Sequence, residues 1–154
     1  TGFGSGLLPW APGTMGTVVA VGIFYGLNAF RSPGFVLLVW IAIFWVGLWA
    51  TRAELQSSGK SDPGYIVVDE ILGYGITAAT AGTDLRLHAL AFVAFRVFDI
   101  AKPWPISALD RWSKKQSKGS WRAAFGVIVD DLAAGVAGFL IVEGVRQGVS
   151  QWGL

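Results

Sequence analysis

One stretch of this sequence limits the possible folds more than any other, because residues 33–51 contain no charged side chain. A helix needs about 20 mostly apolar residues to cross the hydrocarbon core of a bilayer, and this stretch approaches that length. The whole chain is 53% hydrophobic and only 14% charged, whereas soluble domains carry about 25% charged residues. These features favour a membrane protein over a soluble domain with one buried apolar helix.

Further apolar stretches predict an all-α fold. These stretches cover residues 15–30, 66–82, 85–101 and 121–146. All but the last are short for a full span. The Gly- and Pro-rich segment before them, residues 1–14, should be a structured loop. We therefore expect a single domain over residues 1–154. It should be a compact membrane bundle of about four to five hydrophobic helices, some of them short or re-entrant.

Basic residues predict how this bundle is oriented. The connection 102–122 contains one acid, Asp110, and six basic residues: Lys102, Arg111, Lys114, Lys115, Lys118 and Arg122. Short connections rich in Lys and Arg stay in the cytoplasm, so this one and the polar stretch 52–65 should lie inside. The sequence begins at Thr1 rather than Met, so we expect residues upstream of it, and no segment has the form of a signal peptide.

Five carboxylates should meet near the cytoplasmic headgroups in this topology. Asp69 and Glu70 follow one inner connection and Asp99 precedes the other, while Asp130 and Asp131 lie ~13 Å into the last helix. Carboxylates inside membrane helices are costly and mark functional sites. Five of them together would repel one another unless a cation lay between them.

The ligand types narrow the choice of cation. The chain has no cysteine and a single histidine, His88, which excludes thiolate metal sites, cysteine nucleophiles and a pair of catalytic histidines. Oxygen ligands alone favour Mg²⁺ or Mn²⁺ over Zn²⁺. The alternative is that the acids form structural ion pairs with Arg96 and Lys102.

Basic residues beside the acids are candidates for holding a phosphate. Arg96 and Asp99 are three residues apart and share a helix face, which Lys102 continues. Arginine binds phosphate oxygens through two N–H groups, and lysine adds a charge. Arg96 has an alternative role in which its side chain extends to the membrane surface. The Gly-rich N-terminal loop adds Ser5, Thr14 and Thr17, although such loops are more often simple turns.

Four motifs, in order along residues 4–135, resemble those of the phosphatidylglycerophosphatase A family. They are GSGLLP with APGTMGT at 4–9 and 11–17, Asp62-Pro63 with IVVDE and Gly73, RVFD with KPWPI from Arg96, and Asp130-Asp131 with Ala134-Gly135. The resemblance implies removal of the phosphate from phosphatidylglycerophosphate to give phosphatidylglycerol, a Mg²⁺ requirement, an all-helical fold and a place in the bacterial inner membrane. The family includes soluble relatives, and the charge-free stretch 33–51 favours the membrane branch.

We therefore expect a Mg²⁺-dependent lipid phosphatase whose site faces the cytoplasm. The expected catalytic and metal-binding residues are Asp69, Glu70, Asp99, Asp130 and Asp131, and the expected substrate-binding residues are Arg96, Lys102, Ser5, Thr14 and Thr17. The expected partners are a phospholipid substrate and membrane lipids, with no nucleic acid. The alternatives are a phosphatase for another phospholipid or an isoprenoid phosphate, and a cation-linked transporter, because acids in membrane helices also mark ion paths.

Overall fold

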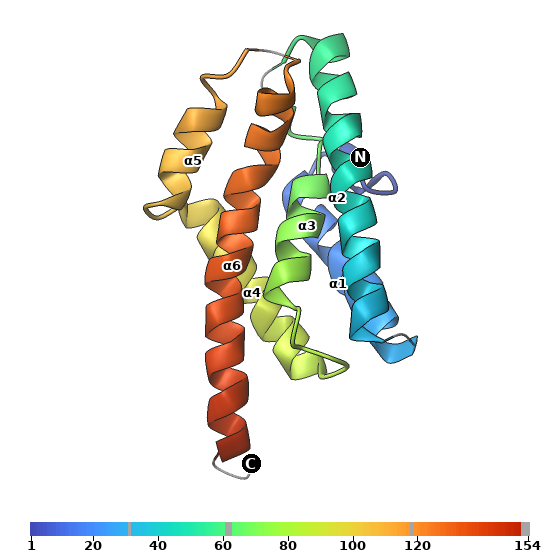
Figure 1. Cartoon of the computed structure of the whole chain (residues 1–154), viewed down its shortest axis with the longest axis vertical. Coiled ribbons are helices and arrows are strands. Elements are labelled where there is room, and N and C mark those ends of the chain that lie inside the picture. Colours follow the sequence, from blue (N-terminus) through green and yellow to red (C-terminus); the bar gives the residue numbers. More distant parts are fainter. Residues whose placement is uncertain (31, 61–62, 118, 152–154) are drawn as a thin grey trace.

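The computed structural model describes residues 1–30, 32–60, 63–117 and 119–151, and these residues form helices and no strand. Asp62 of the second motif and Lys118 of the basic connection lie outside the described residues. A short 3₁₀ helix, η1 (Ser5–Leu7), precedes six α-helices (Figure 1). These are α1 (Pro12–Phe30), α2 (Pro33–Ser58), α3 (Val68–Thr77), α4 (Leu85–Ala101), α5 (Ile106–Ser113) and α6 (Trp121–Gln151).

Helix ends follow local chemistry, and four helices differ from the expected stretches. Helix α3 is shorter than the expected 66–82, and α6 continues past residue 146 to Gln151. Helix α1 begins at Pro12 rather than at residue 15, because proline suits a first helical position, where its missing N–H is not needed. Helix α2 continues seven residues past the apolar stretch to Ser58 and ends at Gly59, whose φ of 65° a glycine adopts without strain. The range 85–101 is confirmed for α4, with Asp84 accepting hydrogen bonds from the Arg86 and Leu87 N–H groups.

Helix α3 lies in the middle of the bundle, between α6 on one side and α1 and α2 on the other (Figure 1). Two glycines let the α3 and α6 backbones touch: a Cβ added at Gly73 would lie 2.5 Å from the Asp131 carbonyl oxygen, and one at Gly135 would lie 2.4 Å from the Gly73 carbonyl oxygen. The Thr77 hydroxyl also donates to the Gly135 carbonyl, at 3.1 Å. This close packing brings the first turn of α3 beside Asp131.

His88 has a structural role in the core. Its Nδ1 lies 2.7 Å from the Tyr74 hydroxyl, and its Nε2 lies 3.1 Å from the Gly82 carbonyl oxygen. A neutral ring with its proton on Nε2 satisfies both contacts, since Nε2 then donates to Gly82 and Nδ1 accepts from Tyr74. His88 is 1% exposed, so its polar atoms are used inside the fold.

Two helices in the described part of the chain are long and apolar enough to cross a bilayer: α2 and α6. The expectation of four to five hydrophobic helices was therefore too high by this measure. Helix α3 has ten residues, or about 15 Å, and the 17 residues of α4 include Arg96 and Asp99. Only 17% of the most apolar window of α2 is buried, against 50% for α6, so α2 presents most of its apolar surface outwards.

The helix ends fall into two groups (Figure 1). The end of α2 and the start of α6 lie at one end of the molecule, at the top of the view. The start of α2, the turn between α3 and α4, and the C-terminal end of α6 lie towards the other end. Helix α5 stands beside the upper half of α6, so the basic connection expected over 102–122 contains a helix of its own (Figure 1).

Candidate active site

Three carboxylates from two helices meet beside the α3–α6 contact. Asp69 and Glu70 of α3 and Asp131 of α6 each offer one oxygen, and these oxygens all lie within 4.8 Å of one another. Asp69 and Glu70 occupy the first turn of α3, where the helix dipole stabilises negative charge. We call these three residues the carboxylate trio.

The surroundings of Glu70 fit a hard divalent cation. Burial raises the pKa of Glu70, and the nearby charge of Asp99 raises it further, although a hydrogen bond with Asp69 opposes the shift. Its Oε2 is buried and has no hydrogen-bond partner among the described residues. A cation among the three carboxylates would satisfy that oxygen and favour the ionised forms. The oxygen-only ligands fit Mg²⁺ or Mn²⁺, because the chain has no cysteine and His88 is used in the core.

Asp99 lies at the edge of the trio and is paired with a cation. Arg96 Nη1 donates to Asp99 Oδ2 at 2.5 Å, and both side chains are largely buried. Asp99 is also close enough to Glu70 and Asp131 to repel their negative charges. The Nε of Arg96 is buried without a hydrogen-bond partner in the described residues, so part of its guanidinium is not used by the ion pair.

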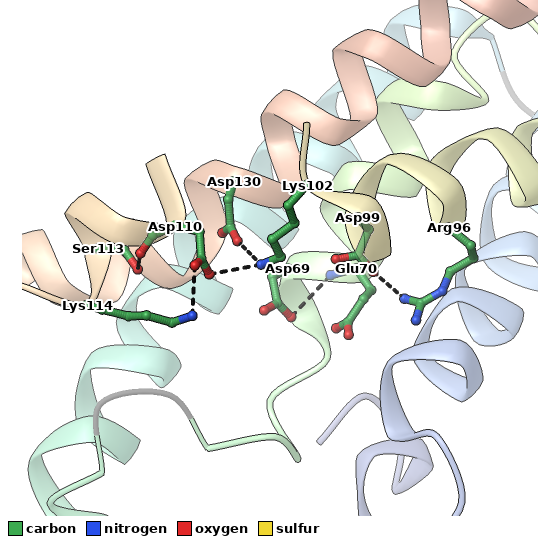
Figure 2. Close-up of polar contacts among 9 residues, drawn as sticks. All are labelled: Asp69, Glu70, Arg96, Asp99, Lys102, Asp110, Ser113, Lys114 and Asp130. Carbon is green, nitrogen blue, oxygen red and sulfur yellow. Dashed lines mark hydrogen bonds and ion pairs between the residues drawn. The ribbon is translucent and has the colours of Figure 1, made fainter. Parts of the chain in front are cut away.

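Asp130, the residue before Asp131, is paired with Lys102. Consecutive helical residues point ~100° apart, so Asp131 faces α3 while Asp130 forms an ion pair with the Nζ of Lys102 at the end of α4 (Figure 2). Lys102 also donates to Asp110 of α5, at 3.0 Å. Burial alone would lower the pKa of Lys102, but its bonds to Asp130 and Asp110 raise it above the ordinary value. Lys102 therefore keeps its positive charge at neutral pH.

Asp110 is the site residue that sequence reasoning missed. It joins Lys102 to Lys114, whose Nζ donates to Asp110 Oδ2 at 2.7 Å (Figure 2). Burial opposes ionisation of Asp110, but its bonds to Lys114 and Lys102 outweigh that effect and lower its pKa. The available signals were that Asp110 is the lone acid of a basic connection and lies four residues before Lys114.

The N-terminal loop reaches this site through the first turn of α1. A Cβ added at Gly13 would lie 2.2 Å from Glu70 Oε1 and 3.2 Å from Arg96 Nη1. Ser5 and Thr17, expected to bind substrate, donate their hydroxyls to the carbonyls of Gly2 and Gly13, at 2.8 and 2.9 Å. Thr14 lies in the same first turn of α1 and is partly exposed.

The five expected acids are thus divided between two environments. Three form the trio, while Asp99 and Asp130 are paired with Arg96 and Lys102. The trio is a possible metal-binding group, and the ion pairs considered as the alternative form at Asp99 and Asp130. Figure 2 shows that this site draws side chains from α3, α4, α5 and α6.

Comparison with known proteins gives consistent matches over nearly the whole chain. The sequence model of a family described as phosphatidylglycerophosphatase A matches residues 1–146. A phosphatidylglycerophosphatase A of Escherichia coli is 37% identical, covering 93% of this chain and 80% of its own length. A phosphatidylglycerophosphatase A of Haemophilus influenzae is 32% identical, covering 94% of this chain and 85% of its own length. A Bacteroides thetaiotaomicron protein is 34% identical, covering 95% of this chain and 90% of its own length. It is provisionally named a phosphatidylinositol-3-phosphatase. No solved structure gives a significant match.

Proposed function

The chain belongs to the phosphatidylglycerophosphatase A family, and on this basis we propose that it hydrolyses phosphatidylglycerophosphate to phosphatidylglycerol and phosphate. In this reaction a water oxygen bonds to phosphorus, the bond from phosphorus to the glycerol oxygen breaks, and the released alcohol takes up a proton. The observation that carries the proposal is the carboxylate trio placed beside Arg96 and Lys102. Metal-binding acids next to phosphate-binding cations are one arrangement that supports phosphomonoester hydrolysis.

Asp69, Glu70 and Asp131 are the proposed ligands of a Mg²⁺ ion. Their mutual distances and the unpartnered Glu70 oxygen support this assignment. When bound, the ion would neutralise phosphate charge and make water more acidic. Asp99 and Asp130 hold Arg96 and Lys102 in place, and the carboxylates around the reacting water are available to accept its proton.

Arg96 and the start of α1 are the proposed phosphate-binding surface. The first turn of a helix leaves N–H groups without partners and carries a partial positive charge, which together favour a phosphate. Gly13 in that turn lies against both Glu70 and Arg96. Lys102, which stays protonated, adds a second charge from the other side of the site. In this assignment Thr14 lies in the turn that holds the phosphate. Ser5 and Thr17 stabilise the loop and that turn through their hydrogen bonds to the Gly2 and Gly13 carbonyls.

The proposed location is the bacterial inner membrane, with the site facing the cytoplasm. The outward apolar surface of α2 and the basic residues of the 102–122 connection support this orientation. A lipid could then present its phosphate to the site while its acyl chains stay in the bilayer.

A comparison of substrates tests the function directly. Purified protein in detergent with Mg²⁺ would be given phosphatidylglycerophosphate, phosphatidylinositol 3-phosphate, an isoprenoid phosphate and glycerol 3-phosphate, and phosphate release would be measured. We expect the fastest release from phosphatidylglycerophosphate. Glycerol 3-phosphate should react far more slowly, because it lacks acyl chains whose burial contributes about 0.8 kcal/mol per CH₂. Faster release from another lipid would reassign the substrate, and no release from any of them would favour the transporter alternative.

A further inference from the structure

An apolar groove lies where α2, α5 and α6 come together, and none of the carboxylate trio lines it. Its volume is about 580 Å³, and its walls include Trp45, Trp49, Trp112, Trp121, Arg122 and Phe125. Trp45 and Trp49 are both 63% exposed and Trp121 is 50% exposed. We call this feature the tryptophan groove. It contains none of the residues assigned above to the metal, the phosphate or the reaction.

Two arginines give the groove a positive edge. Arg122 is part of its wall. The guanidinium of Arg52 lies over the Trp121 ring, with its carbon 4.5 Å from the ring centre, a distance typical of a cation–π contact. The Arg52 Nε is buried and has no hydrogen-bond partner in the described part of the chain. Neither arginine forms an ion pair with an acid among the described residues, so no carboxylate there neutralises their positive charges.

We propose that the tryptophan groove binds one anionic phospholipid of the surrounding bilayer, separate from the substrate. The proposal rests on the proposed membrane location. An apolar groove with a cationic edge matches a molecule that has an acyl chain and an acidic headgroup. Indole rings favour the membrane interface, and guanidinium groups bind phosphodiester oxygens through paired N–H groups. Helix α2, which forms one wall, exposes apolar side chains along its length, so the groove opens onto a surface that suits lipid.

Lipid retention measured by native mass spectrometry tests this site without using activity. The protein would be purified in detergent and given phosphatidylglycerol or phosphatidylcholine with identical acyl chains. We expect the unmodified protein to retain phosphatidylglycerol preferentially. The double variant Arg52→Gln/Arg122→Gln should retain it about tenfold less, because two charges near the headgroup are lost. Retention of phosphatidylcholine should not change.

Two matched variants locate the bound lipid. Arg86→Gln removes an exposed positive charge from the start of α4 and should leave retention unchanged. Asp69→Asn alters the carboxylate trio and should also leave it unchanged, which separates this site from the proposed active site. Because lipid retention is measured without turnover, the groove can be shown to bind lipid even if the protein proves inactive as a phosphatase. Likewise, phosphatase activity can be found even if the groove binds no lipid.

Several results would overturn the proposal. These are equal retention of both lipids, an equal loss with Arg86→Gln, a loss with Asp69→Asn, or a dimer that the groove substitutions dissociate. The last result would identify a second copy of the chain as the occupant. Should circular dichroism reveal that the double variant is unfolded, Trp112→Ala takes its place, since it removes only one wall of the groove. Unchanged phosphatidylglycerol retention in Trp112→Ala would then contradict the proposal.

Discussion

At the scale of single residues, neighbouring acids in this protein have different surroundings. Asp131 lies within the trio, whereas Asp130, the preceding residue, is held by Lys102. Glu70 has a buried oxygen without a partner in the described residues, while Asp99 is paired with Arg96. Substitutions should therefore separate the three acids of the trio from the two acids that are paired with Arg96 and Lys102.

The first prediction concerns the trio. Asp69→Asn, Glu70→Gln and Asp131→Asn should each lower kcat by at least ~100-fold, because each removes a charge that the metal and the transition state require. Asp130→Asn should cause a smaller loss, since Lys102 keeps Asp110 as a partner. Phosphate release under saturating lipid is the measurement.

Stability and a control accompany that measurement. Thermal unfolding in EDTA should show no loss of stability for the trio variants, because removing one of several crowded negative charges relieves repulsion. Glu54→Gln is the control, because the Glu54 side chain accepts a hydrogen bond from the Tyr65 hydroxyl at 2.6 Å, which the side-chain oxygen of glutamine can also accept. A loss with Glu54→Gln as large as that of the trio would place the active site elsewhere.

The second prediction concerns Arg96. Arg96→Lys keeps the positive charge but loses the planar set of N–H groups that can serve Asp99 and a phosphate together. We expect kcat/KM to fall by more than ~10-fold, the cost of one lost charged hydrogen bond. Arg86→Lys, at an exposed position of the same helix, should have no effect. Equal activity of the two variants would remove Arg96 from the proposed phosphate site.

At the scale of helices, the site depends on close contacts that only glycine permits. The start of α1 contacts Glu70 at Gly13, and α3 contacts α6 at Gly73 and Gly135. Through Gly13 the Gly-rich N-terminal motif reaches Glu70, although the hydroxyls of Ser5 and Thr17 donate to backbone carbonyls within the motif.

The third prediction tests the contact between α1 and Glu70. In Gly13→Ala the new Cβ would lie 2.2 Å from Glu70 Oε1, so either α1 or the carboxylate must move. Phosphate release should fall by more than ~10-fold, since small displacements of catalytic groups cost this much or more. Gly22→Ala, on the same helix with nothing within 4 Å of its Cβ, should leave activity unchanged and not lower the melting temperature. Full activity in Gly13→Ala would contradict the role given to this turn.

Sequence patterns predicted the helices whose ends carry strong signals. Helix α4 was placed correctly because charged and proline residues follow Ala101. Helix α5 was missed, because it has only eight residues, half of them polar or charged, and lies within a basic connection. Without α5 the bond between Asp110 and Lys102 could not be foreseen. The five acids were identified from the sequence, but their division into a trio and two ion pairs depends on side-chain directions around α3 and α6.

At the scale of the whole molecule, the proposed orientation can be tested at the two ends of the bundle. Ser32 directly precedes α2, and Ser117 belongs to the segment between α5 and α6. The starts of α2 and α6 lie towards opposite ends of the bundle (Figure 1). Because the chain has no native cysteine, single cysteines can report the side on which each end lies.

The fourth prediction concerns that orientation. Ser117→Cys should react with a membrane-impermeant thiol reagent only after the cells are opened, because the basic connection should remain in the cytoplasm. Ser32→Cys should react in intact cells. Labelling of Ser117→Cys in intact cells would reverse the orientation and place the site on the wrong side for a lipid made in the cytoplasm.

The most direct test of the central claim is the metal dependence of phosphate release from phosphatidylglycerophosphate. The account predicts that EDTA abolishes release by the purified protein, that added Mg²⁺ restores it, and that Glu70→Gln stays inactive when Mg²⁺ is added. The reason is that the trio is crowded with negative charge and holds a buried oxygen without a partner among the described residues. Full turnover in EDTA, with bound metal measured to be absent, would contradict it.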